Sequence, residues 1–261
     1  MSEGKVQLRI EGGIASVLFD RPQARNAMTW AMYGQLGDIC DQLQADASVR
    51  LVTFRGAGGE AFVAGTDIEQ FKAFNTGEDG VAYEQQIDRC IHKLESLPMP
   101  TVAVIEGWTI GGGLAIATTC DFRIATPASR FGVPIAKTLG NCLSVANLAR
   151  LSAVFGMPRV RRMLMLAEIL SADEALSCGF LSQIAGAGEI DAALARLCER
   201  LAVLAPVTQS VTKEGLRRLV AQDLPGDEDL IRRCYGSEDF REGVNAFVGK
   251  RSPAWKGAWP G

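Results

Sequence analysis

The sequence predicts a mixed α/β fold that begins with a largely parallel sheet and ends in a helical region. Segments rich in β-forming residues alternate with segments of helical periodicity up to about residue 125. Two glycine-bearing loops stand out, the second of which follows a predicted strand, and from about residue 143 the chain becomes mostly helical. Because strand–helix–strand alternation is typical of parallel strands joined by crossover helices, we expect an α/β core in residues 1–195 and a helical region in residues 196–261.

The first third of the chain carries strand, turn and helix signals in succession. Residues 6–11 and 14–20 are β-rich and are separated by Gly12-Gly13, which predicts a hairpin. A short buried strand is predicted at residues 51–55. Between the hairpin and this strand, apolar residues at helical spacing predict a helix with Thr29 as its N-cap. These residues are Met28, Met32, Leu36, Ile39 and Leu43.

The middle of the chain repeats this alternation. A helix that carries Ile87, Ile91 and Leu94 must end before Pro98, because a residue that precedes proline disfavours the helical conformation. Residues 101–105 and 121–125 predict two further strands. These elements complete the core.

Helical signals dominate the C-terminal part. Residues 171–174 form a capping-box pattern that Gly179 follows as a stop signal. One apolar stripe predicts a helix near residues 190–201, and a second, in the tail, predicts a helix whose apolar face meets a partner subunit. The members of the two stripes are Ile190, Leu194, Leu197 and Leu201, and Phe240, Val244, Phe247 and Val248.

Composition excludes several classes of protein. With 27 basic and 30 acidic residues the chain has no strong positive field, so nucleic acid is not expected as its main partner. The longest informative apolar stretch, residues 107–120, is too short to span a bilayer, and residues 1–10 show no signal peptide. The seven widely spaced cysteines and the single histidine predict reduced thiols in a cytoplasmic protein with no structural metal.

Two glycine-bearing loops are the candidates for chemistry. One covers residues 61–68 and the other residues 106–114, and each is predicted to open a helix. Free backbone N–H groups at helix N-termini bind anionic oxygen, so two such loops side by side could form an oxyanion hole. Alternatively, the glycines only permit tight turns, and the triple glycine at 111–113 matches neither a dinucleotide-binding fingerprint nor a phosphate-binding loop.

Six segments, in order from about residue 6 to 256, together make the chain resemble the crotonase (enoyl-CoA hydratase/isomerase) superfamily. They are Asp20-Arg-Pro-Gln-Ala-Arg-Asn26-Ala, Ala64-Gly65-Thr66-Asp67, Ile105-Glu-Gly-Trp-Thr-Ile-Gly111-Gly112-Gly113-Leu, Cys120-Asp121-Phe-Arg-Ile-Ala125, Phe131-Gly132-Val-Pro134, and the tail from Glu238 to Arg251. The resemblance implies a spiral of ββα units and a helical C-terminal region that builds trimers or hexamers and completes the coenzyme A pocket.

The same resemblance implies an acyl-CoA thioester as substrate, with coenzyme A as its carrier and no covalently bound cofactor. It places the backbone amides of Thr66 and Gly112 in an oxyanion hole, and it passes the adenine of coenzyme A along the loop Ala64–Ile68, which includes Asp67. It further implies contacts to coenzyme A from Arg25, Phe247 and Lys250, the last two across a subunit boundary.

One departure from the family pattern bears on the reaction. Hydratases of this family handle water with two glutamates, and the matching positions here hold Ala115 and Ile135. Residues 122–167 contain no Asp or Glu at all. Efficient hydration is therefore not expected.

Some polar residues near these positions leave alternatives open. Asn141 could orient water or a substrate oxygen, or act as a turn residue after Gly140. Cys142 could donate a proton or be a small core residue, and Lys137 could carry charge into the pocket or lie at the surface. Elsewhere, a structural role is favoured for His92, for Asp67 as a helix cap and for Glu106 as a partner of backbone or arginine.

Two functions follow from these residues. The first is an enzyme that stabilises a thioester enolate or oxyanion without the glutamate pair, as a decarboxylase, an isomerase or a thioester hydrolase. Decarboxylation fits best, because loss of carbon dioxide leaves an enolate and needs no base. The second is a non-catalytic subunit that binds acyl-CoA or serves as a scaffold.

Overall fold

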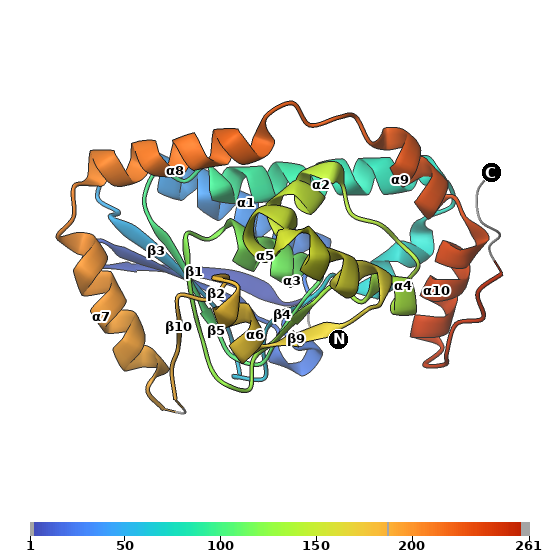
Figure 1. Cartoon of the computed structure of the whole chain (residues 1–261), viewed down its shortest axis with the longest axis horizontal. Coiled ribbons are helices and arrows are strands. Elements are labelled where there is room, and N and C mark those ends of the chain that lie inside the picture. Colours follow the sequence, from blue (N-terminus) through green and yellow to red (C-terminus); the bar gives the residue numbers. More distant parts are fainter. Residues whose placement is uncertain (1–2, 187, 257–261) are drawn as a thin grey trace.

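The structure is a computed structural model that describes residues 3–186 and 188–256, and it has the predicted mixed α/β architecture (Figure 1). Its strands form two sheets. The six-stranded sheet has the order β1 (Lys5–Glu11), β2 (Ile14–Asp20), β3 (Leu51–Gly56), β5 (Thr101–Ile105), β7 (Phe122–Ala125) and β10 (Gln183–Ile184). The four-stranded sheet has the order β4 (Ala61–Ala64), β6 (Trp108–Ile110), β8 (Arg130–Gly132) and β9 (Ile169–Ser171).

Parallel pairing dominates both sheets, as the strand–helix alternation predicts. In the larger sheet only the hairpin β1–β2 is antiparallel, and in the smaller sheet only β8–β9 is. The chain visits the sheets alternately, from β3 to β4, from β5 to β6 and from β7 to β8, and helices follow each pair. These repeated ββα units confirm the predicted spiral.

Ten α-helices and two 3-10 helices surround the sheets in the described part of the chain. They are η1 (Pro22–Ala24), α1 (Trp30–Ala45), η2 (Ile68–Ala73), α2 (Gly77–Glu95), α3 (Gly112–Thr119), α4 (Ile135–Thr138), α5 (Val145–Met165), α6 (Ala172–Ser177), α7 (Ile190–Ala202), α8 (Pro206–Ala221), α9 (Glu228–Tyr235) and α10 (Glu238–Val248). None of these helices is long and apolar enough to cross a bilayer.

The local signals in the sequence correspond to the observed element ends. Thr29 caps α1 by accepting a hydrogen bond from the Met32 N–H, and Ser171 does the same for the Glu174 N–H at α6. Gly179 follows α6 with a φ of +82°. Such a left-handed residue after the C-cap is the usual helix stop.

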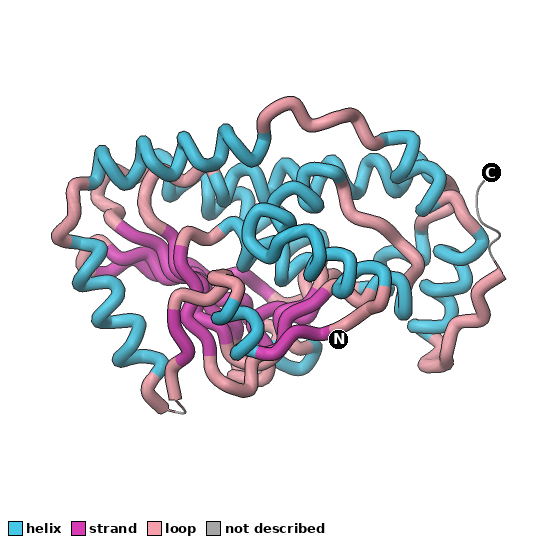
Figure 2. Tube along the Cα trace, viewed as in Figure 1, coloured by secondary structure: helices cyan, strands magenta, loops and turns pink. Residues whose placement is uncertain are grey.

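The helical C-terminal region covers two different parts of the core. In Figure 1, α8 runs along the upper edge from α7 at the left, whereas α9 and α10 lie at the right-hand end. Figure 2 shows the strands below α8, between α7 at the left and α10 at the right. Helix α7 spans residues 195 and 196, the expected division between core and tail, and packs on β3 and β7. Helices α9 and α10 pack on α2 and η2.

Candidate active site

The two glycine-bearing loops lie side by side because β4 and β6 pair in parallel. Ala64 pairs with Ile110 at the ends of these strands, so both loops leave the same edge of the smaller sheet. A Cβ on Gly111 would lie 3.7 Å from the Gly65 Cα. Gly111 has a φ of +54°, which favours glycine, and it directly precedes α3.

Each loop presents one backbone N–H group with no acceptor among the described residues. Met28 holds the first loop through hydrogen bonds from its N–H to the Gly65 C=O (2.9 Å) and from the Asp67 N–H to its C=O (2.8 Å). The Thr66 N–H lies between these bonds and is not used by them. Gly112 is the first residue of α3, so its N–H has no partner within the helix. The geometry therefore provides two donors suited to an anionic oxygen.

Three hydroxyl groups adjoin these donors, and we call them the hydroxyl chain (Tyr33, Thr66 and Tyr83). The Tyr33 hydroxyl lies 2.9 Å from Thr66 Oγ1, and the Tyr83 hydroxyl lies 3.2 Å from the same atom. A Cβ on Gly112 would lie 2.3 Å from the Tyr33 hydroxyl oxygen. Burial raises the pKa of both phenols above the ordinary value for tyrosine, so both stay protonated.

A second group of polar residues lies beside the hydroxyl chain, and we call it the carboxyl cluster (Glu84, Tyr235 and Asn141). The Tyr235 hydroxyl donates to the buried Glu84 carboxyl at 2.6 Å, and the Asn141 amide donates to the Tyr235 oxygen at 3.3 Å. Burial raises the pKa of Glu84 to about 8. The Asn141 Oδ1 is buried and has no hydrogen-bond donor in the described structure, so it can accept a bond from a substrate or water.

Aromatic rings separate the hydroxyl chain from the carboxyl cluster. The Tyr83 and Tyr235 rings lie 6.0 Å apart, and Phe71 and Phe240 pack in the same group with centroids 6.0 Å apart. Helices α9 and α10 supply Tyr235 and Phe240 from the same chain. The C-terminal helices therefore wall this site within one subunit.

Of the residues expected at coenzyme A, Arg25 and the loop Ala64–Ile68 are neighbours. The Ala64 N–H donates to the Arg25 C=O at 3.0 Å, and the Arg25 side chain is exposed. Asp67 has the structural role that the sequence favours, because it accepts from the Glu69 N–H at the start of η2. It also pairs with Arg21 at 2.7 Å.

Phe247 and Lys250 lie exposed at the C-terminal end of α10, which packs on η2 and α4 of its own chain. Their expected reach across a subunit boundary stays a prediction. The expectation that the whole apolar stripe of this helix meets a partner is wrong, because Phe240 and Val244 are buried against residues of the same chain that include Phe71 and Leu139.

The positions that hold glutamates in family hydratases are apolar and pack on the core. Ala115 lies in α3 and Ile135 at the start of α4, and both are partly buried. Lys137 is exposed, in line with the surface role considered for it. Glu106 pairs with Arg55 at 2.6 Å, and the His92 side chain is 56% exposed, so both have the structural or surface roles expected.

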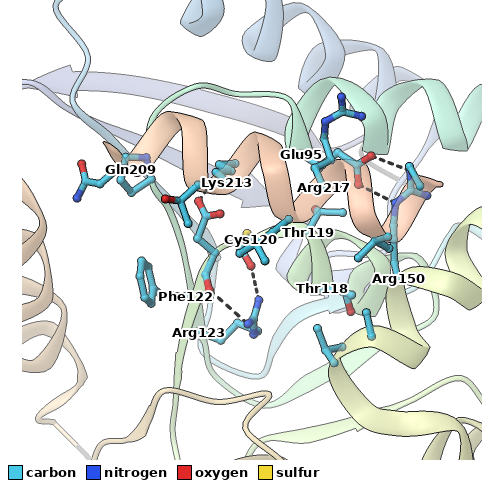
Figure 3. A pocket seen from close by; sticks show the side chains of 18 of the residues that line it. Glu95, Thr118, Thr119, Cys120, Phe122, Arg123, Arg150, Gln209, Lys213 and Arg217 are labelled. Atoms are coloured by element: carbon cyan, nitrogen blue, oxygen red, sulfur yellow. Dashed lines mark hydrogen bonds and ion pairs between the residues drawn. The ribbon is translucent and has the colours of Figure 1, made fainter. Parts of the chain in front are cut away.

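Two cavities lie away from the paired loops. A cavity of about 870 Å³ lies between α8, α5 and residues 118–123, and an Arg150–Glu95 ion pair and a Lys213–Asp121 ion pair lie in its wall (Figure 3). Thr66, Gly112 and Asn141 are not among its lining residues. A smaller cavity of about 480 Å³ lies beside Glu84, on the α2–α9 side of the carboxyl cluster.

The sequence reasoning missed four residues of this site: Tyr33, Tyr83, Glu84 and Tyr235. The chain has only three tyrosines, and all three converge here. The small number of tyrosines was the one sequence feature that could have drawn attention to these residues. It does not reveal which residues form hydrogen bonds with one another, because the bonded partners lie 17 to 151 positions apart along the chain.

A spiral of ββα units with two free amides at the edge of its smaller sheet defines a crotonase-fold protein. The profile of the enoyl-CoA hydratase/isomerase family matches residues 9–258. The short-chain-enoyl-CoA hydratase of Clostridium acetobutylicum is 31% identical over 96% of this chain and 97% of its own length. The chain therefore belongs to the enoyl-CoA hydratase/isomerase family.

Other relatives and solved structures agree with this assignment. The (E)-benzylidenesuccinyl-CoA hydratase of Thauera aromatica is 29% identical over 97% of this chain and 99% of its own. The crystal structure of an enoyl-CoA hydratase/carnithine racemase from Magnetospirillum magneticum is 32% identical, with a TM-score of 0.79 and coverage of 98% and 96%. A methylmalonyl-CoA decarboxylase in complex with 2-nitronate-propionyl-CoA is 24% identical and shares the fold, with a TM-score of 0.88 and coverage of 97% and 98%.

Proposed function

We propose that this protein is an enzyme that acts on an acyl-CoA thioester and holds the thioester oxygen with the Thr66 and Gly112 amides. The observation that supports this is the pair of unpartnered N–H groups where β4 and β6 end side by side. A thioester oxygen gains negative charge as an enolate or a tetrahedral species forms. Fixed donors aimed at that charge lower the barrier, and loss of one typically costs about 3 to 4 kcal/mol.

We propose decarboxylation of a malonyl-type thioester as the reaction that fits these residues best, with isomerisation and thioester hydrolysis as its competitors. The bond from the α-carbon to the carboxylate breaks, carbon dioxide leaves, and the electron pair becomes an enolate on the held oxygen. The α-carbon then takes up one proton, which water can supply. This sequence needs no base, which agrees with Ala115 and Ile135 in place of the two glutamates.

Coenzyme A is proposed to lie along the loop Ala64–Ile68. Arg25 supports this assignment, because its backbone C=O bonds to the loop and its exposed side chain carries a guanidinium, a group that suits a phosphate. Phe247 and Lys250 are proposed to contact the nucleotide. Asn141 is proposed to orient water or a substrate oxygen through its unpartnered Oδ1.

A panel of acyl-CoA thioesters followed by mass spectrometry tests this proposal. We expect turnover of a malonyl-type member and hydration of crotonyl-CoA several orders of magnitude below that of a glutamate-pair enzyme, because each acid–base group typically supplies ~10²–10⁴-fold. Tight binding without turnover of any member would favour the non-catalytic acyl-CoA-binding or scaffold subunit instead. Fast hydration would show that the acid–base residues lie elsewhere.

We propose that the protein assembles into trimers or hexamers in the cytoplasm. The support comes from α8, whose apolar residues Val207, Val211 and Leu219 are 65–74% exposed. Sedimentation at micromolar concentration should show a trimer or a multiple of it, and Leu219→Lys should weaken it. A folded monomer of the unaltered chain would contradict this.

A further inference from the structure

Tyr33 is buried at the point where the two loops meet. Its side chain is 2% exposed, and its hydroxyl touches both loops, Thr66 at 2.9 Å and the backbone of Gly112. A Cβ on Gly112 would lie 2.3 Å from the hydroxyl oxygen but 3.7 Å from the ring carbon that carries it. The hydroxyl, and not the ring, is therefore the part of Tyr33 that faces the start of α3.

The hydroxyl chain has one more proton than its own hydrogen bonds use. Its three hydroxyls carry three protons, and each hydroxyl can donate once. Two contacts join them, Tyr33 to Thr66 and Thr66 to Tyr83. No other acceptor lies within hydrogen-bonding distance of these three oxygens in the described residues. One O–H group therefore remains to donate to a group outside the chain.

Either oxygen of each contact can donate, so the direction of donation decides which hydroxyl holds the spare proton. A Cβ on Gly112 would lie 2.3 Å from the Tyr33 hydroxyl oxygen and 3.3 Å from Thr66 Oγ1, whereas Tyr83 bonds to Thr66 from α2. When Tyr83 donates to Thr66 and Thr66 donates to Tyr33, every hydroxyl polarises the next and the free O–H falls on Tyr33. This direction places the third donor beside the two free amides.

We infer that the Tyr33 hydroxyl is a third hydrogen-bond donor to the thioester oxygen, and that the Thr66 and Tyr83 hydroxyls orient it. The inference rests on the proposed function, since it assumes that a thioester oxygen occupies the site made by the Thr66 and Gly112 amides. Tyr33 is then a catalytic residue, and the hydroxyls of Thr66 and Tyr83 are positioning groups. No proton is transferred in this role. The phenol remains neutral and stabilises charge on the oxygen.

Isotope-edited infrared spectroscopy of butyryl-CoA carrying ¹³C at its carbonyl tests this directly. Butyryl-CoA is saturated and carries no carboxylate, so it serves as an unreactive probe. Binding to the unaltered protein should move the carbonyl stretch to lower frequency, because hydrogen bonds weaken the C=O bond. Tyr33→Phe should lose part of that shift, while the affinity for butyryl-CoA falls by less than about tenfold. With a substrate found by the panel, kcat should fall by about 10²-fold with little change in KM.

Tyr83→Phe is the matched control, because it deletes a phenol hydroxyl of the same chain but leaves Thr66 to donate to Tyr33. It should keep most of the carbonyl shift. An equal shift in the unaltered protein and in Tyr33→Phe would overturn the inference, as would a larger loss in Tyr83→Phe. If bound butyryl-CoA showed no shift in the unaltered protein, the amide site of the proposed function would itself fail.

Thr66→Val provides a second route if Tyr33→Phe does not fold, as judged by circular dichroism. Valine keeps the shape and the backbone amide of Thr66 but removes the hydroxyl that orients Tyr33. We expect a partial loss of the carbonyl shift, smaller than that in Tyr33→Phe. A shift identical to that of the unaltered protein would contradict the positioning role of Thr66.

Discussion

The hydroxyl chain and the carboxyl cluster lie on either side of one group of aromatic rings, yet they differ in the charge that they can carry. Tyr83 and Glu84 are consecutive residues of α2, and each bonds to a different cluster. The hydroxyl chain holds only neutral donors near neutral pH. The carboxyl cluster holds an acid whose pKa is raised to about 8.

This difference separates two chemical tasks, the stabilisation of charge and the transfer of a proton. The hydroxyl chain can stabilise developing charge on an oxygen at any ordinary pH, because its phenols do not ionise there. The carboxyl cluster can hold or release a proton near neutral pH. Burial is the largest cause of both results, since it opposes ionisation of every acid in the site.

The largest expected effect is the pH dependence of stability caused by Glu84. Its pKa rises from 4.5 to about 8 through burial, with help from the charges of Asp88 and Asp227 and against the bonds from Tyr235 and Ser144. Between these values the native state keeps a proton that the unfolded state releases. The free energy of unfolding should therefore fall by up to about 1.4 kcal/mol per pH unit as pH rises through this window.

Urea unfolding from pH 5 to pH 9 measures this slope. Glu84→Gln should flatten it, and Glu60→Gln should leave it unchanged, because Glu60 is exposed. Asp88, also raised in pKa by burial, leaves a residual slope in Glu84→Gln. An identical slope in the unaltered protein and in Glu84→Gln would show that Glu84 ionises normally in the folded state.

An intermediate effect is expected from Gly112→Ala on the side of the hydroxyl chain. The new methyl group would overlap the Tyr33 hydroxyl, and such overpacking typically costs about 1–3 kcal/mol. Adding Tyr33→Phe removes the overlapping oxygen and should restore most of the loss in the free energy of unfolding. Gly112→Pro would create the same overlap with the Tyr33 hydroxyl. A loss of activity in that variant would therefore not report the loss of the Gly112 N–H alone.

Gly34→Ala is the control for this pair. Gly34 is an exposed residue of α1 with open space around its Cα, so alanine there should be neutral or slightly stabilising. Equal stability losses in Gly112→Ala with and without Tyr33→Phe would mean that the Tyr33 hydroxyl does not confine this position.

The smallest effect compares one phenol from each cluster. Tyr33→Phe and Tyr235→Phe each remove one hydroxyl and should each cost about 1 kcal/mol of unfolding free energy. Only Tyr235→Phe should move the pH dependence to higher pH, because the Tyr235 hydroxyl lowers the pKa of Glu84. A shift of the profile in Tyr33→Phe as well would show that the two clusters titrate together.

Much of the fold was predictable because its signals are local. The hairpin around Gly12-Gly13, the Thr29 cap and the helix that ends before Pro98 each depend on residues within a few positions of one another. Such short-range preferences hold when tertiary packing agrees with them. The parallel pairing of β4 and β6, which brings Thr66 and Gly112 together, was not predicted, because these strands are only four and three residues long and lie within the two glycine-bearing loops.

The surroundings of the candidate site were not predictable in the same way. Tyr33, Thr66 and Tyr83 meet only after α1 and α2 have packed on the sheets, and no local pattern encodes that contact. The apolar stripe of α10 also shows that a local pattern does not identify its packing partner. Its periodicity revealed an apolar face, but not that η2 and α4 of the same chain cover Phe240 and Val244.

The short parallel bridge between Met28 and Thr66 bears on how a ligand enters. Arg25, Met28 and Asn26 tie residues 57–67 to the segment before α1 through hydrogen bonds of 2.8–3.0 Å. The loop that carries Thr66 can open only if these bonds break together, so the amide protons of Met28, Ala64 and Asp67 should exchange with solvent as one slow unit. We therefore expect the Thr66 loop to keep its position when a ligand binds.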